Sequence, residues 1–404
     1  MRYFLVLSAS ILGGLLLSSM IGINSLMPVY YKLIGGKGIE TNNSLFKTSD
    51  GNYVLAGRTD SYSIGDMNMN VVKVNEEGNV VWDKNFGAEE SEEASSGIEA
   101  SDKHLMIVGH SDSYGGGVGM KDFMVLRLDE KGLLKWQKTY GTNTSIDEAS
   151  DIVETEDGNF LVVGTSLSLE TAASDVMAVM IDKNGNEIWR KTYGFEKNDG
   201  AKAVIRTKNG FTIVGQTESL TYGRWEVWVI SIDKEGEQVW QRSYGGPDNE
   251  MANTIVEMPD GNFVVAGFSY SFSEGSSDAW AFEITADGKK IWDKNLGGMS
   301  TDEFFDAAVA ADGNVVLAGY TDVYVPNEYF ENTSTLGHNI FLAKLNRKGE
   351  LYWKNTLGGE QMQVAHGIVE SHQKDGFVLS GYTNEDIDNK GMDMFVIKVG
   401  KNGK

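Results

Sequence analysis

One pattern recurs through almost all of this 404-residue chain: a tryptophan followed five residues later by a glycine. It occurs six times, 51 to 61 residues apart, at Trp82/Gly87, Trp136/Gly141, Trp189/Gly194, Trp240/Gly245, Trp292/Gly297 and Trp353/Gly358. A seventh copy near the start has tyrosine in place of tryptophan, at Tyr30 and Gly35. A period of this size indicates an array of equivalent units rather than the two or three separate domains that length alone suggests.

Each copy has the same order of short apolar runs and glycine turns. In the third copy, residues 151–154 come before the turn Asp157-Gly158, and residues 160–164 follow it. The alternating run at residues 176–181, a second glycine turn and the tryptophan segment complete the copy. Short turns of Asp, Asn and Gly between alternating apolar runs are the strongest short-range signal of a β-hairpin. Each copy is therefore predicted to be a four-stranded antiparallel meander.

A closed ring of such meanders would bury the sheet faces that a single meander leaves exposed. One meander leaves both faces exposed, whereas a closed ring covers each sheet with its neighbours. We therefore predict an all-β fold, a seven-bladed β-propeller. The last copy ends at Lys404, directly after the turn at Gly403, and lacks a tryptophan strand, whereas residues 27–34 are such a strand without the other three. We predict that this N-terminal strand completes the last blade, which also hides two open sheet edges.

The first residues differ from the repeat. Met1-Arg2 is basic, and residues 3–22 contain no charged side chain. This length fits the apolar part of an export signal and is also just enough to span a bilayer. We expect residues 1–25 to be a signal peptide or an uncleaved membrane anchor. Residues 26–404, the propeller, are then expected to lie outside the cytoplasm.

The charge balance limits the partners. The formal net charge is −23, from 58 acidic and 35 basic residues, so a phosphate backbone would be repelled and nucleic acid is not an expected partner. The chain has no cysteine, which removes disulfides and thiolate chemistry. We expect a monomer that meets a protein or a glycan at the cell surface, and the membrane if the N-terminal segment is retained.

Two positions are of one chemical type in all seven copies. A hydroxyl residue lies two positions after the glycine of the second strand: Thr59, Ser111, Ser166, Thr217, Ser269, Thr321 and Thr383. An acid or amide lies fourteen positions before the tryptophan: Asn68, Asp122, Asp175, Glu226, Asp278, Asn339 and Asp393. We expect the hydroxyl to donate to this acid or amide. Because a catalytic group is needed only once, sevenfold recurrence indicates architecture, and the recurring tryptophans are likewise expected to pack between blades.

The loops between second and third strands vary most in length, and they share one face of a propeller with the connections between blades. The sixth copy carries the extra residues, within 321–338. Variable loops on a rigid framework commonly bind ligands. We predict ligand contacts from aromatic residues on this face: Trp225, Tyr324, Tyr329, Phe330, Tyr62, Tyr114 and Phe272. For Tyr62, Tyr114, Tyr324 and Phe272, the alternative is that the rings plug the tops of the blades.

The same face gathers acidic residues near the expected mouth of the central channel. Oxygen-rich clusters can bind Ca²⁺, and a calcium site would use some of the following carboxylates: Glu93, Glu148, Asp151, Glu250, Glu303 and Asp306. The alternative is that these carboxylates are only solvated. No other cofactor is predicted. The five histidines have no metal-ligand spacing, and no histidine is paired with a serine nucleophile in the sequence.

The repeat also resembles known propellers. The stretches Asp-Gly-Asn-Phe-Val-Val-Ala-Gly at 260–267 and Ile-Trp-Asp-Lys-Asn-Leu-Gly-Gly at 291–298 are similar to repeats of exported bacterial and archaeal propellers of mostly unknown function, and to delta-60-type and quinoprotein-like repeats. The resemblance covers about residues 26–404 and implies the fold. Many quinoprotein enzymes use vicinal cysteines, which this chain lacks. We therefore expect a non-catalytic binding or scaffold module; the alternative is a quinone-dependent oxidoreductase or a metal-dependent, lactonase-type hydrolase.

Overall fold

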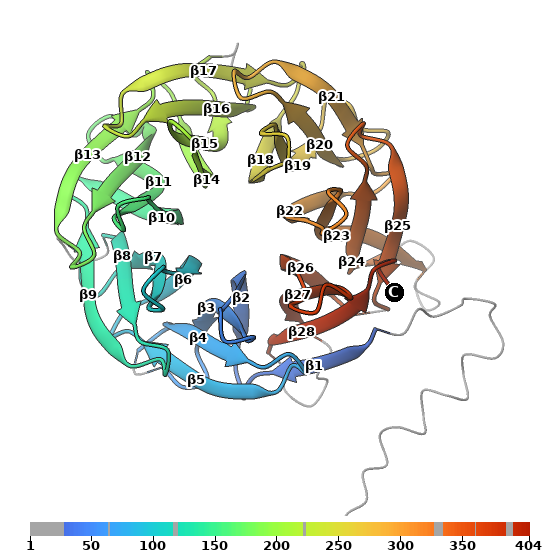
Figure 1. Ribbon diagram of the computed structural model, residues 1–404, viewed down its shortest axis with the longest axis horizontal. Helices are drawn as coiled ribbons and strands as arrows, with labels where there is room; N and C mark the ends of the chain where they lie inside the picture. Colours follow the sequence, from blue (N-terminus) through green and yellow to red (C-terminus); the bar gives the residue numbers. More distant parts are fainter. Residues whose placement is uncertain are drawn as a thin grey trace, which may run out of the picture.

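The computed structural model describes residues 28–404 except residues 64, 116–119, 221–223, 327–333, 360 and 385–390. The described residues form seven four-stranded antiparallel sheets arranged as blades around a common axis (Figure 1). This confirms the predicted seven-bladed propeller. The predicted signal or anchor at residues 1–25 lies outside the described residues. Within the described ranges, no helix is long and apolar enough to cross a membrane.

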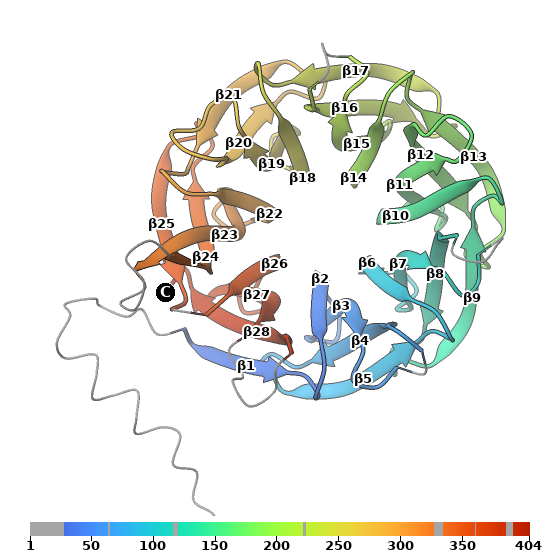
Figure 2. The same cartoon turned by 180° about the vertical axis from the view of Figure 1, so that it is seen from behind.

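Strands follow one another outward from the axis in each blade, and Figures 1 and 2 show the innermost strands from either side. The innermost strands of blades one to seven are β2 (Glu40–Lys47), β6 (Glu92–Glu99), β10 (Ser145–Glu154), β14 (Asp199–Thr207), β18 (Glu250–Glu257), β22 (Asp302–Val309) and β26 (Gln363–Glu370). The second strands are β3 (Tyr53–Thr59), β7 (Leu105–Ser111), β11 (Phe160–Ser168), β15 (Gly210–Thr217), β19 (Phe263–Ser269), β23 (Val315–Pro326) and β27 (Gly376–Thr383). The third strands are β4 (Asn68–Val74), β8 (Asp122–Leu128), β12 (Ser174–Ile181), β16 (Glu226–Asp233), β20 (Asp278–Ile284), β24 (Ser334–Leu345) and β28 (Asp393–Gly400). The outer strands are β5 (Val80–Phe86), β9 (Leu134–Tyr140), β13 (Glu187–Tyr193), β17 (Gln238–Tyr244), β21 (Lys290–Asn295), β25 (Leu351–Leu357) and, for blade seven, β1 (Tyr30–Ile34).

The N-terminal strand closes the ring. β1 lies antiparallel to β28, with Tyr30 opposite Lys398 and Ile34 opposite Met394 (Figure 1). The Val29 N–H extends the ladder by donating to the Lys398 carbonyl at 2.7 Å. Blade seven therefore takes its outer strand from one end of the chain and its other three from the other end, as predicted.

Each recurring tryptophan packs on the blade that follows it. A Cβ added at Gly132, in the turn between the third and outer strands of blade two, would lie 3.1 Å from the ring of Trp82 in blade one. This glycine has φ near +74°, a conformation that favours glycine, so turn geometry and inter-blade packing both require it. Each apolar core cluster likewise spans two neighbouring blades, and Trp82 packs against one of them. The prediction that the tryptophans pack between blades is confirmed.

In blades one, two and five the recurring hydroxyl has a different partner from the one predicted. Thr59 lies opposite Asn68 in the strand register, but its hydroxyl donates to Oε1 of Glu40, on the innermost strand, at 2.6 Å. Glu40 also lies directly opposite Thr59, and its second oxygen accepts the Gly36 N–H at 2.6 Å. This carboxylate binds the connection between blades as well as the hydroxyl, because its two oxygens can accept from both.

The acid on the innermost strand is itself a sevenfold position that the sequence interpretation missed. It is an acid in six blades and glutamine in the seventh: Glu40, Glu92, Asp147, Asp199, Glu250, Asp302 and Gln363. Equivalent hydroxyl donations occur from Ser111 to Glu92 at 2.8 Å and from Ser269 to Glu250 at 2.9 Å. These buried side chains belong to the framework of the ring.

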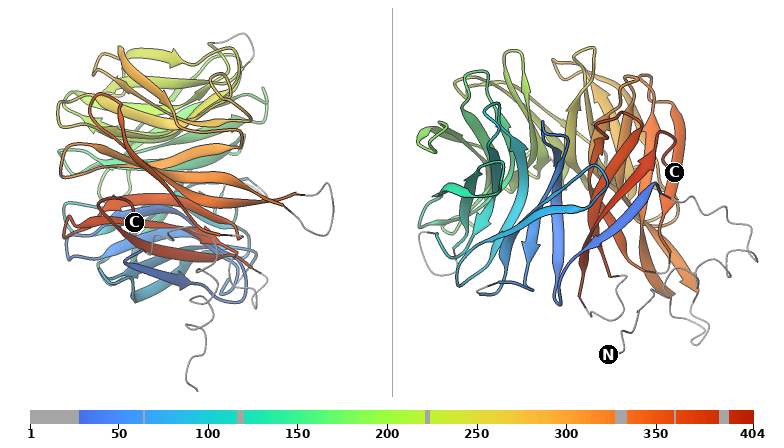
Figure 3. Two further views of the ribbon diagram at one scale, coloured as in Figure 1. Left: turned by 90° about the vertical axis from the view of Figure 1, so that its right-hand side faces the viewer. Right: turned by 60° about the horizontal axis from the view of Figure 1, so that its bottom comes forward.

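Blade six departs from the others in its second hairpin. β23 and β24 pair from Val315 opposite Leu345 outward to Pro326 opposite Ser334. The neighbouring strands β22 and β25 stop pairing at Thr321 and Ile340, so the outer part of the hairpin is a two-stranded ribbon that projects from the ring (Figure 3). The sequence interpretation placed the extra residues of the repeat at this point.

Candidate functional site

All seven innermost strands carry a β-bulge at the same place. In β2 the register with β3 shifts between Asn42 and Ser44, so Asn43 is the extra residue. A bulge leaves one residue unpaired and re-aims its side chain. The seven extra residues line both of two adjoining cavities in the central channel, with volumes of about 210 and 410 Å³. We call them the bulge ring: Asn43, Ser95, Ser150, Lys202, Asn253, Phe305 and His366.

One side of the channel is aromatic. The rings of Phe305 and His366 stack with centroids 4.2 Å apart and planes 12° apart. Tyr320 stacks on Phe305 at 5.8 Å, and Tyr382 lies 5.3 Å from His366. These four rings, contributed by blades six and seven, form what we call the aromatic wall. It offers a flat, partly exposed surface to the channel.

The opposite side, from blades one to four, is polar. Glu93 accepts from Asn43 at 2.7 Å and pairs with Arg58 at 2.9 Å. Glu148 pairs with Lys121 at 2.6 Å. Lys202 is exposed and lines both cavities. We call these residues the polar wall, and it presents both donors and acceptors to the channel.

Burial displaces the pKa values of Glu303 and His366. Burial raises the pKa of Glu303 to about 7, although Asn253 donates to its Oε1 at 2.8 Å and the charge of Lys202 opposes the shift. Burial lowers the pKa of His366 to about 4. The His366 Nε2 has no hydrogen-bond partner among the described residues. Near neutral pH this imidazole is therefore uncharged, and its Nε2 is buried.

Two carboxylates deeper in the channel hold the blades together. Asp306 accepts the N–H of Ile368, in the next blade, and of Ala307, each at 2.8 Å. Asp151 accepts the Ser96 hydroxyl of the preceding blade at 2.7 Å and the Val204 N–H of the following blade at 2.9 Å. Burial raises the pKa of both carboxyl groups, that of Asp306 to about 7. Their oxygens are used by the protein, which indicates an architectural role.

The six carboxylates proposed for calcium do not gather at one point. Glu93 and Glu148 line the channel and Glu303 accepts from Asn253, whereas Glu250 accepts the Gly246 N–H in the connection between blades four and five. Asp151 and Asp306 lie deeper, in the bonds described above. Across the described ranges, no group of three or more histidine, aspartate or glutamate side chains could hold a metal ion.

The aromatic loop residues differ in their exposure. Tyr62, Tyr114 and Phe272 are 59%, 40% and 43% exposed, and Phe272 also packs on the buried Trp280, with ring centroids 5.7 Å apart. They form part of the rim of the loop face. Phe272 lies beside the connection between blades, because a Cβ added at Gly246 would be 3.2 Å from its ring.

The other predicted contacts are Trp225, Tyr324, Tyr329 and Phe330. Trp225 is half-buried. Its backbone N–H donates to Asn249 Oδ1 at 3.1 Å, and its backbone carbonyl accepts the Glu250 N–H at 2.8 Å. Tyr324 lies in β23, opposite Leu336 in the register. Tyr329 and Phe330 fall outside the described residues.

Comparisons with known proteins support the fold and nothing finer. No protein-family model and no curated protein matches the chain. The structure of Sqt1 from Chaetomium thermophilum aligns with a TM-score of 0.50 and 10% identity, covering 92% of this chain and 99% of that one. A protein of unknown function from Bacteroides caccae aligns with a TM-score of 0.44 and 10% identity, covering 85% and 98%. A mannose phosphorylase from Leishmania mexicana, solved with a phosphate ion, has a TM-score of 0.35 and 12% identity, covering 64% and 85%.

Proposed function

We propose that this protein is a non-catalytic binding module outside the cytoplasm, and that it recognises a glycan through the central channel and its loop-side mouth. The asymmetry of the bulge ring carries the proposal. Framework positions keep one residue type around the ring, whereas the seven bulge positions differ in size, charge and polarity. Positions at which a regular repeat departs from its own pattern are commonly functional sites.

The two walls of the channel match the chemistry of a sugar. A pyranose ring has an apolar face of C–H groups, which stacks on flat side chains such as Phe305 and His366. Its edge carries hydroxyl groups, which both donate and accept hydrogen bonds. Lys202, the Glu93 carboxylate and the amide of Asn253 can satisfy these groups on the polar side. Ligand sites commonly combine an apolar lining with a few placed polar groups in this way.

Accessible aromatic side chains around the mouth extend the surface on which a polymer could lie. Tyr62, Tyr114 and Phe272 are exposed on the loop face, to which the channel opens. A glycan longer than one sugar could therefore contact the rim while one unit occupies the channel. The extracytoplasmic location is inferred from residues 1–25, whose composition fits an export signal or anchor.

The proposal is tested by applying the purified full-length protein to an array of bacterial, archaeal and eukaryotic surface glycans. Each captured glycan is then titrated by calorimetry against the wild type and three variants. Phe305→Ala and Lys202→Ala should each weaken binding about tenfold, because each removes one wall of the site. Tyr352→Ala is the control and should leave binding unchanged, because Tyr352 is 60% exposed on the outer strand β25 and lies outside the channel.

Capture of no glycan, or equal binding by all three variants, would overturn the proposal. Chemical conversion of a captured glycan would overturn its non-catalytic part and favour the alternative of an enzyme at the channel mouth.

A further inference from the structure

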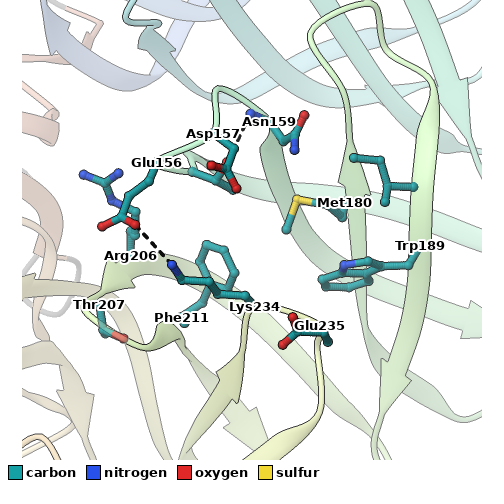
Figure 4. Close-up of a pocket in the computed structure, with 13 residues that line it drawn as sticks. Glu156, Asp157, Asn159, Met180, Trp189, Arg206, Thr207, Phe211, Lys234 and Glu235 are labelled. Carbon is teal, nitrogen blue, oxygen red and sulfur yellow. Dashed lines mark hydrogen bonds and ion pairs between the residues drawn. The ribbon is translucent and has the colours of Figure 1, made fainter.

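A further cavity, separate from the channel, opens on the other face of the ring, between blades three and four. It has a volume of about 280 Å³ and is lined by the tight turns of both blades (Figure 4). Its apolar residues are Met180, Ile188, Trp189 and Phe211. The channel proposed above opens toward the loop face and involves none of these residues.

Blade three lacks an ion pair that blades one, two, six and seven have beside the equivalent aromatic ring. In blade one, Asp50 of the first turn pairs with Lys73 of the third strand at 2.7 Å, and in blade six Asp312 pairs with Lys344 at 2.6 Å. The same two positions in blade three are Asp157 and Met180, since Met180 lies opposite Trp189 as Lys73 lies opposite Trp82. A shorter apolar side chain therefore replaces a cation here and leaves space beside the tryptophan ring.

A second departure loosens the contact between the two blades. The first turn of blade two is bonded to blade three by the Ser101 N–H, which donates to Glu154 at 2.8 Å. The equivalent bond from blade six to blade seven runs from the Ala311 N–H to Glu370 at 2.7 Å. In blade four this position is Arg206, which cannot accept a hydrogen bond. The first turn of blade three is thus not held against blade four by this bond.

A third departure lowers one wall of the cavity. In blade four the first turn consists of only Lys208 and Asn209, between paired Thr207 and Gly210. In blade three the equivalent connection runs through residues 155–159. Three departures from the repeat therefore fall at one junction, and together they expose the Trp189 side of the cavity.

The rim of the cavity favours a positive charge. Glu156, Asp157 and Glu235 outnumber Arg206 and Lys234 among the lining residues. Lys234 bridges the two blades by pairing with Glu156 at 3.1 Å (Figure 4), but the two side chains are 55% and 61% exposed, so the pair contributes little stability and can be displaced.

The Trp189 ring gives the cavity a flat aromatic surface. Lys191 Nζ lies 5.9 Å from the centroid of this ring, and Lys191 is not among the residues that line the cavity.

We propose that this cavity binds a small amphipathic amine, with a one- or two-ring or alkyl group on the floor and the ammonium group at the rim carboxylates. The size supports this class, because a dry cavity of about 150 Å³ is sufficient to hold benzene, and this one is larger. The proposal stands apart from the channel site, since its residues lie on other turns and on the opposite face.

The test uses three probes that share one ring system and differ in charge: tryptamine, indole and indole-3-acetate. Each is titrated against the full-length protein by ligand-observed NMR or calorimetry. Tryptamine should bind most tightly and indole-3-acetate at least about tenfold more weakly. Failure of all three to bind, or equal binding regardless of charge, would overturn the proposal.

Two variants assign the binding to this cavity. Met180→Lys introduces the lysine that blades one, six and seven have at this position and fills the floor, and Ile188→Lys adds a cation to a cavity residue that is 52% exposed. Both should abolish tryptamine binding. Ile291→Lys is the matched control, because Ile291 occupies the equivalent position in blade five, is 48% exposed and lies outside the cavity. Unchanged binding in both cavity variants, or equal loss in the control, would contradict the assignment.

Discussion

Phe305 and His366 occupy equivalent bulge positions in neighbouring blades, and their rings stack with centroids 4.2 Å apart. The imidazole is enclosed by aromatic neighbours, which removes water from around it and lowers its pKa to about 4. The other five bulge positions carry small or polar residues or a lysine, so the aromatic wall is confined to one arc of the ring. The stacked pair is the feature that most clearly distinguishes this channel from a uniform pore.

Replacing Phe305 should raise the pKa of His366. Phe305→Ala admits water beside the imidazole, which favours its charged form, so the pKa should move from about 4 toward its usual value of 6.5. A pH titration of the histidine resonances by NMR measures the shift. Phe268→Ala is the control, because Phe268 contacts Tyr270 instead. A His366 pKa that remains near 4 in Phe305→Ala would show that the stack does not cause the depression.

Glu303 should make the protein less stable as pH rises. Its pKa is raised to about 7 in the folded state, so the folded protein keeps a proton that the unfolded chain has released above its ordinary pKa of 4.5. The free energy of unfolding therefore falls as pH rises through this window. Glu303→Gln carries no such proton, and its free energy of unfolding should fall less between about pH 5 and about pH 8. Denaturant unfolding at several pH values measures both slopes, and equal slopes would contradict the prediction.

The glycine after each outer strand should tolerate no side chain. A Cβ at Gly297 would lie 2.4 Å from Asp278 Oδ1 and 2.5 Å from its Cγ. Gly297→Ala should therefore lower the free energy of unfolding by about 1 to 3 kcal/mol, as overpacking does in other cores. The adjacent Gly298 is an internal control, because a Cβ there meets nothing within 4 Å. Equal stability of Gly297→Ala and Gly298→Ala in thermal unfolding would show that Asp278 can move aside without cost.

Loss of β1 should destabilise the whole ring. Without this strand the edge of β28 is exposed, and the contact of Tyr30 with the Gly78 turn of blade one is lost. A chain that begins at Gly35 should aggregate or unfold at lower temperature than one that begins at Leu26, which retains the strand. Size-exclusion chromatography and thermal unfolding compare the two. A monomeric product of unchanged stability would mean that the ring does not depend on this closure.

The blades and their closure could be predicted because they are periodic. The six recurring tryptophans and Tyr30 each pack on a turn glycine of the next blade, as Trp82 does on Gly132, so the repeated positions predict the contacts between blades. The hydroxyl of Thr59 was assigned the wrong partner, since both Glu40 and Asn68 lie opposite it and sequence spacing alone does not choose between two neighbouring strands.

The candidate sites were harder to find in the sequence. A bulge shifts the register by one residue without any marker residue, so Phe305 and His366 read as ordinary members of their strands. A signal existed in retrospect: each lies three residues after the sevenfold acid or glutamine of the innermost strand, at Asp302 and Gln363. The cavity beside Met180 depends on three separate departures from the repeat, and their meeting at one junction becomes visible only in the folded ring.

The most direct measurement is a crystal structure of the protein with a captured glycan. The proposed function predicts a sugar ring stacked on Phe305 and His366, with its hydroxyl groups toward Lys202 and Glu93. A glycan bound elsewhere, with the channel free of it, would contradict the assignment of the bulge ring as the recognition site.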